Sequence, residues 1–287
     1  MGRSGLVNPL LDVVPGIEFG ELRPFGHKVR QEIDARKRGG LVTKVAVFWQ
    51  DLDNAQIFEI SANSKFAPAS LLKTPILIAA LKKADATPGF LDRKVPYAAP
   101  PGDVAPNILS QLPPLVVGKE YSVDELLRVM TARSDNGAAL TLYNLIGEEP
   151  LQRVYRDFGI LIPDVRGPAD SMSVREFSAF FRILYNASYL SREQSERALE
   201  YMAQSEFKQG LVTGVPLGVI VAHKFGERKD DGTRQLHDCG IVYEPEEPYI
   251  LCIMTRGTSF EEQARTISSI SRIVYDEVHA EAVKEQR

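Results

Sequence analysis

The order of strand-like and helix-like segments constrains the fold of this chain more than any other feature of its sequence. Residues 44–50 and 57–61 are rich in Val, Ile and Phe, and the polar stretch between them predicts a hairpin. Three more strand-like segments occur only toward the C-terminus, at 218–223, 235–243 and 249–255. Because the sequence between these two groups is helical in pattern, we expect an antiparallel sheet built from both chain ends, with a helical insertion.

The helical segments carry clear start and stop signals. Residues 26–38 have a helical pattern that ends at paired glycines, a common helix terminator. Capping-box patterns begin at Ser122 and Ser173, each ahead of an apolar run. An amphipathic pattern over 259–282 predicts a long C-terminal helix. The expected fold class is therefore α+β: a five-stranded antiparallel sheet flanked by N- and C-terminal helices, plus an inserted all-helical lobe.

Charge, length and cysteine content exclude several classes of protein. The 287 residues carry a formal net charge of −4, which argues against a nucleic-acid binder with a broad basic surface. No apolar run approaches the length of a membrane span, and the first residues show no export signal. The four histidines are scattered and no Cys/His cluster has zinc spacing, so we expect neither a metal nor a cofactor.

The two cysteines have two possible states. If 235–243 and 249–255 pair as a hairpin, Cys239 and Cys252 lie roughly opposite one another, and a cross-strand disulfide is possible. Two free thiols in the core is the state that the sequence favours, because unpaired cysteines commonly pack as small apolar residues.

The first chemically suggestive pattern is Ser70-Leu-Leu-Lys73, at the start of an apolar helix. Positions i and i+3 of a helix share a face, so the hydroxyl and the amine can meet. A serine needs a neighbouring base to become a nucleophile, and a lysine of lowered pKa can be that base. Alone the pattern is weak, since Ser205 and Lys208 repeat it and most such pairs are solvated helix faces.

Two further patterns follow along the chain. Ser134-Asp135-Asn136 lies between two predicted helices, where a second hydroxyl could relay a proton and an amide could bind substrate; alone it could simply cap a helix. Lys224-Phe225-Gly226 is expected at the end of a strand, where the lysine adds positive charge and the glycine permits close approach of a ligand. It too is weak alone.

The three patterns together, in this order and these contexts, carry a specific signal. The combination of S-x-x-K, S-D-N and K-T-G is typical of class A β-lactamases and penicillin-binding proteins. The chain resembles the serine β-lactamase and DD-peptidase superfamily, closest to the class A β-lactamase catalytic domain. The resemblance extends from about residue 44 to the C-terminal helix. It implies one catalytic unit whose site lies between an α/β lobe (26–67 and 215–287) and an all-helical lobe (68–214), after an N-terminal extension (1–25).

The resemblance also implies roles for individual residues. Ser70 would be acylated, Lys73 would take its proton, and Ser134, supported by Lys224, would pass a proton to the leaving nitrogen. Asn136 would bind the amide on the acyl side of the substrate. The oxyanion hole would consist of the Ser70 N–H and an N–H just past Gly226, for which Arg228 is a candidate.

The chain departs from the family pattern at two places. Phe225 stands where the family has a hydroxyl that helps bind the substrate carboxylate, so Arg228 or Arg234 would have to supply positive charge unless they are solvated loop residues. The segment 159–172, which in class A enzymes carries a water-activating glutamate, contains no Glu; its carboxylates are Asp164 and Asp170. Either could be a deacylation acid or a helix cap.

From these features we expect a serine hydrolase that forms an acyl-enzyme with β-lactams or D-Ala-D-Ala-like peptides and hydrolyses it slowly. The partner would be a small-molecule β-lactam or a peptidoglycan stem peptide, with no nucleic acid, and the protein would be a monomer. A non-hydrolytic penicillin-binding or sensor module, and a serine esterase or amidase on the same fold, remain alternatives. Work on cell-wall substrates implies an extracytoplasmic location.

Overall fold

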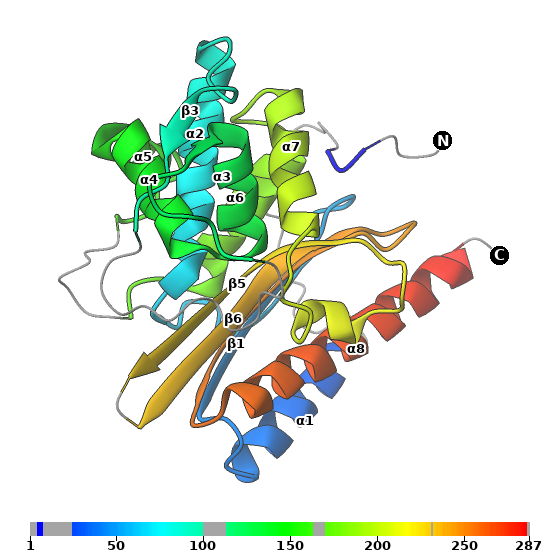
Figure 1. Ribbon diagram of the computed structural model, residues 1–287. Coiled ribbons are helices and arrows are strands. Elements are labelled where there is room, and N and C mark those ends of the chain that lie inside the picture. The colour runs from blue at the N-terminus through cyan, green and yellow to red at the C-terminus, as the bar shows by residue number, and fades with distance from the viewer. Residues whose placement is uncertain (1–4, 8–24, 100–112, 163–169, 231, 286–287) are drawn as a thin grey trace. The chain divides into compact units, whose positions relative to one another are not determined.

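The structure is a computed structural model that describes residues 5–7, 25–99, 113–162, 170–230 and 232–285. The chain divides into two units (Figure 1). Unit 1 comprises Met1–Leu10, Leu72–Ile162 and Ile183–Phe207. Unit 2 comprises Leu11–Leu71, Pro163–Arg182 and Lys208–Arg287.

Unit 2 is built on the predicted five-stranded antiparallel sheet, whose strand order is β2-β1-β7-β6-β5. Its strands are β1 (Lys44–Asp51), β2 (Ile57–Ile60), β5 (Val221–Asp230), β6 (Thr233–Val242) and β7 (Tyr249–Gly257). Helices α1 (Phe25–Arg38) and α8 (Phe260–Glu285) lie side by side against the sheet (Figure 1). The α+β class and the five-stranded sheet predicted from the sequence are confirmed.

An aromatic cluster fixes α1 on the sheet. The Phe25 ring packs edge-on against Trp49 of β1 and Phe58 of β2, with distances between ring centres of 5.1 Å and 5.2 Å. All three side chains are buried. Aromatic pairs in this geometry add stability beyond the area that they bury, so these contacts help to hold α1 against the sheet.

Unit 1 is mainly helical. Its complete helices are α2 (Lys73–Ala86), α3 (Val123–Ala132), α4 (Asn136–Ile146), α5 (Glu148–Asp157) and α7 (Arg192–Ala203). α2 packs against each of the other four, and accordingly its side chains are mostly apolar and buried. A small ladder pairs β3 (Lys94–Pro96) with β4 (Glu120–Ser122).

Two 3₁₀ turns and one further helix complete the described elements. The 3₁₀ turn η1 (Ala69–Leu72) leads into α2, the helix α6 (Val174–Tyr185) begins in unit 2, and the 3₁₀ turn η2 (Leu211–Gly214) precedes β5. Both predicted capping boxes are present: Ser122 caps α3 with Glu125, and Ser173 exchanges hydrogen bonds with Glu176 at the start of α6. Among the helices described here, none is long and apolar enough to cross a membrane.

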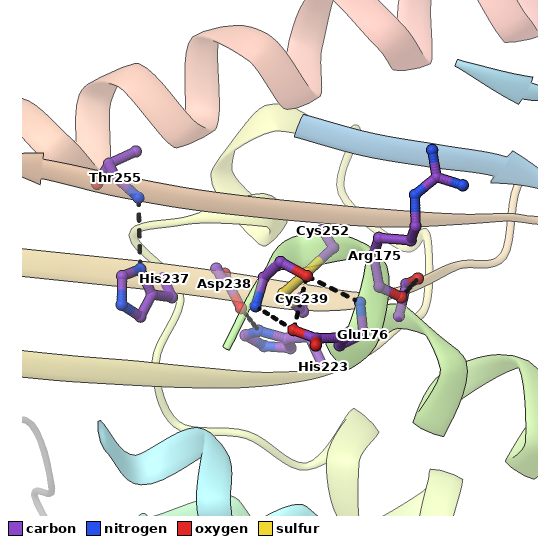
Figure 2. Close-up of a disulfide and its surroundings, with 10 residues drawn as sticks. Arg175, Glu176, His223, His237, Asp238, Cys239, Cys252 and Thr255 are labelled. Atoms are coloured by element: carbon purple, nitrogen blue, oxygen red, sulfur yellow. Dashed lines mark hydrogen bonds and ion pairs between the residues drawn. A yellow bond between two sulfur atoms is a disulfide. The ribbon is translucent and has the colours of Figure 1, made fainter. Parts of the chain in front are cut away.

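Two predictions need correction. The Lys224-Phe225-Gly226 motif does not end a strand, because β5 continues to Asp230, which pairs with Thr233 of β6. The cysteines are not free thiols: Cys239 and Cys252 are directly opposed in the β6–β7 ladder and form a disulfide (Figure 2). The sequence pattern marked the hairpin but not the register that places the two Cβ atoms face to face.

Candidate active site

Lys73 is the centre of a hydrogen-bonded cluster in unit 1. It is the first residue of α2 and its side chain is buried. Its ammonium donates to the Ser134 carbonyl oxygen at 2.6 Å, to Ser134 Oγ at 3.1 Å and to Asn136 Oδ1 at 2.7 Å. Lys73 is thus hydrogen-bonded to two other predicted site residues, Ser134 and Asn136, which lie 61 and 63 positions further along the chain.

The start of α4 presents the Ser134 and Asn136 groups. Asp135 caps this helix, because its carboxylate accepts from Ala138 N at 2.7 Å. The Tyr97 hydroxyl donates to the same carboxylate at 2.9 Å, and burial together with this bond raises the pKa of Tyr97. Gly137 leaves room for this contact, since a Cβ there would collide with the Tyr97 hydroxyl and lie 2.6 Å from Ala98 O.

Ser134 itself has φ 58°, in the left-handed region that few non-glycine residues adopt. Such a conformation costs on the order of 1 kcal/mol or more and persists only where the surroundings hold it. Here the Lys73 ammonium binds both the carbonyl and the hydroxyl of Ser134, which supplies that restraint.

Ser70 lies in unit 2, in η1, and is half-buried. Ala69 before it has φ 49°, a second left-handed non-glycine residue in a motif segment. Gly226 of β5 comes so close to this segment that a Cβ there would lie 2.9 Å from Pro68 O and 3.2 Å from Leu71 N. The glycine of the third motif is therefore required by backbone packing against the Ser70 segment.

Lys224 is buried in β5, with Gly226 two positions further along on the same face of the strand. Its ammonium donates to Phe225 O at 2.9 Å and lies 4.4 Å from the centre of the Phe225 ring. Phe225 is buried and alternates onto the other face. That face also carries His223, whose Nδ1 lies 2.7 Å from the carboxylate of Asp238 (Figure 2).

The two arginines proposed for carboxylate binding differ in position. Arg228 is exposed, lies on the Lys224 face of β5 by strand alternation, and pairs with Asp230 at 2.9 Å. Arg234 lies on the opposite face of β6, where its Nε donates to Thr258 O at 3.1 Å and its guanidinium lies over the Phe260 ring.

Asp170 is bound by cationic and amide groups. Its carboxylate pairs with Arg256 of β7 and accepts from Gln235 Nε2 at 3.1 Å. Although partial burial raises the pKa of Asp170, the bonds from Arg256 and Gln235 outweigh it, and the pKa lies below its usual value. A carboxylate held in this way is a weak proton acceptor. Asp164 lies outside the described residues.

Four polar residues around these segments were not identified from the sequence: Tyr97, Gln235, His237 and Arg256. None of the four belongs to one of the three sequence motifs. Gln235 and His237 did carry a signal, because polar residues that alternate along a predicted strand share one face of it. Among the described residues, no group of three His, Cys, Asp or Glu side chains could hold a metal ion.

Known proteins share this architecture. The structure of PBP-A matches with a TM-score of 0.75 at 20% identity, covering 93% of this chain and 100% of that one. A mutant of PBP-A, described as an acyl-enzyme complex with penicillin G, matches with a TM-score of 0.72 at 22% identity, covering 88% and 97%. A β-lactamase from Chitinophaga pinensis DSM 2588 matches with a TM-score of 0.74 at 20% identity, covering 88% and 99%.

At these identities the structural matches establish the fold alone. A search among curated proteins found no match. The model of the beta-lactamase enzyme family, however, matches residues 28–278, which is most of the chain. This chain belongs to the beta-lactamase enzyme family.

Proposed function

We propose that this protein is a serine hydrolase that is acylated at Ser70 by β-lactams or by D-Ala-D-Ala-like peptides. The Ser70 oxygen bonds to the substrate carbonyl carbon, and the carbonyl carbon–nitrogen bond breaks. Lys73, in its neutral amine form, takes the proton of Ser70; Ser134 gives its hydroxyl proton to the leaving nitrogen and is reprotonated by Lys73. Water then cleaves the ester and restores the Ser70 hydroxyl.

The observation that carries this proposal is the cluster of Lys73 with Ser134 and Asn136. One amine within 3.1 Å of the Ser134 hydroxyl provides a short path for a proton, and catalytic proton transfer needs such hydrogen-bond reach. The Asn136 amide is held by the same amine and would bind the substrate amide. Lys224 adds positive charge from β5, and Gly226 admits the Ser70 segment against that strand.

We propose further that hydrolysis of the acyl-enzyme is slow. The segment 159–172 has no glutamate, and Asp170 is engaged by Arg256 and Gln235. Acylation is therefore better supported than deacylation, which favours a penicillin-binding or DD-peptidase type of enzyme over a fast β-lactamase. The natural substrate class would be peptidoglycan stem peptides, with the protein acting as an extracytoplasmic monomer.

Intact-mass spectrometry after mixing with benzylpenicillin tests both steps. We expect a covalent adduct on the wild type that persists for minutes to hours, and none on Ser70→Ala. No adduct on the wild type and no penicillin consumed would refute acylation. Rapid consumption without a lasting adduct would refute slow deacylation. An adduct that never decays would favour a sensor module, and turnover of p-nitrophenyl esters that penicillin does not block would favour an esterase.

A further inference from the structure

Two side chains of β6 hold both backbone groups of Ala67, three residues before Ser70. Gln235 Oε1 accepts from Ala67 N at 3.1 Å, and His237 Nε2 lies 2.9 Å from Ala67 O. Both side chains are buried, and as residues i and i+2 of a strand they share one face. We call Gln235 and His237 the β6 clamp.

The far side of each clamp residue is also bonded. Thr255 N donates to His237 Nδ1 at 3.3 Å (Figure 2), and Gln235 Nε2 donates to Asp170 at 3.1 Å. Because Nδ1 accepts a hydrogen bond, the ring proton resides on Nε2 and points at Ala67 O. Burial lowers the pKa of His237 to about 4, so the ring is neutral at neutral pH.

Charged groups near the clamp come from three other segments. Asp170 precedes α6 and Arg256 belongs to β7, and the two form an ion pair. Lys44 of β1 donates to Lys65 O at 2.8 Å and lies over the Phe66 ring, which itself meets His237 edge-on at 5.5 Å. The clamp is thus part of a network of hydrogen bonds, an ion pair and ring contacts around the segment that leads to Ser70.

The backbone that follows Ala67 needs such restraint. Ala69 is in the left-handed region, and Pro68 O packs against the α-carbon of Gly226. Conformations of this kind persist where surrounding contacts over-determine them, and they occur preferentially at functional sites. Two side-chain hydrogen bonds to Ala67, three residues upstream, are a direct means of fixing the Ser70 orientation.

We propose that Gln235 and His237 are positioning residues that hold Ser70 in its reactive orientation through Ala67. The inference rests on the proposed role of Ser70 as the nucleophile. Neither side chain touches the reacting atoms, so their loss changes the acylation rate and leaves binding of penicillin nearly unaltered. A displacement of a nucleophile by about 1 Å can cost a factor of about 100 in rate.

The test is the concentration dependence of labelling by a fluorescent penicillin. For His237→Leu we expect the limiting acylation rate to fall at least tenfold, with little change in the half-saturating concentration. His237→Gln restores an N–H near the Nε2 position and should recover most of the rate. His237→Asn, one methylene shorter, should not. His27→Leu, which replaces an exposed histidine of α1, is the matched control and should label like the wild type.

Circular dichroism and thermal unfolding establish which variants fold, and if His237→Leu does not, the Gln and Asn variants decide. A wild-type limiting rate in His237→Asn would overturn the clamp. So would variants in which only the half-saturating concentration of penicillin rises and the limiting rate is unchanged. A wild type that is not labelled at all would refute the proposed function and the clamp with it. A labelled wild type with fully active variants would refute only the clamp.

Discussion

Protonation of one buried residue, His237, should contribute a separable part of the loss of stability of this protein in acid. The side chain is fully buried, and both ring nitrogens are used: Nε2 at 2.9 Å from Ala67 O, and Nδ1 as acceptor from Thr255 N at 3.3 Å. A second proton on the ring would sit on Nδ1 and point at the Thr255 N–H, so that two hydrogen-bond donors would face each other. Burial, as the main cause, lowers the pKa of His237 from 6.5 to about 4, with Asp170 raising it and Arg256 lowering it to a smaller extent.

The sign and size of the effect follow from proton linkage. Between pH 6.5 and 4 the unfolded chain binds a proton at this histidine and the folded protein does not, so protons favour unfolding. Stability therefore falls as the pH drops through this window and levels off below it. At 1.36 kcal/mol per pKa unit the free energy of unfolding loses about 3 kcal/mol, a sizeable part of the 5–15 kcal/mol typical of proteins.

Urea unfolding at pH values from 7.5 to 4 measures this loss, with fluorescence of Trp49, the single tryptophan, as the probe. Carboxylates titrate in the same range, so the quantity of interest is the difference in unfolding free energy between the wild type and His237→Gln. On acidification we expect the wild type to lose about 3 kcal/mol of unfolding free energy relative to the variant. His27→Gln controls for loss of one imidazole. A wild-type-minus-variant difference that stays constant with pH would refute a buried neutral His237.

Three further perturbations test the packing around the site. Gly226→Ala places a Cβ 2.9 Å from Pro68 O and should cost about 1–3 kcal/mol of stability in urea unfolding, together with most penicillin labelling. Ser122→Ala removes the cap of α3 and should cost about 1 kcal/mol without changing the labelling rate. Phe225→Leu removes the ring beneath the Lys224 ammonium and should slow labelling about tenfold, whereas Phe225→Tyr keeps the ring and the rate.

Local patterns were sufficient for most of the fold. Alternating and β-branched runs located all five strands of the main sheet, and the capping serines Ser122 and Ser173 located the starts of α3 and α6. These signals act within a few residues and so can be read from the sequence. The end of β5 could not, because its length depends on pairing with β6 and on the turn near Gly232, which offer no apolar signal.

Residues of the candidate site that belong to a motif could be identified from the sequence. Residues whose contacts depend on the pairing register of a strand could not. Ser134 and Asn136 were identified by their motif, and the structure places both on Lys73. Gln235 and His237 reach Ala67 only because β6 pairs in one particular register, and a shift by one residue would turn both to the other face. The same register decides that Cys239 opposes Cys252.

Strand alternation also changes how the substitution at Phe225 is understood. The phenyl ring cannot replace a hydroxyl as a donor to a substrate carboxylate, but its centre lies 4.4 Å from the Lys224 ammonium, which it supports.

A second cation for a substrate carboxylate would have to come from the face of the sheet that carries Lys224 and Gly226. Arg234 is directed to the other face and bonded to Thr258 O. Arg228 is on the correct face and exposed, and its pair with Asp230 is of a kind that contributes only about 0–1 kcal/mol. Exchanging Asp230 for a substrate carboxylate would therefore cost little, which makes Arg228 the better candidate of the two.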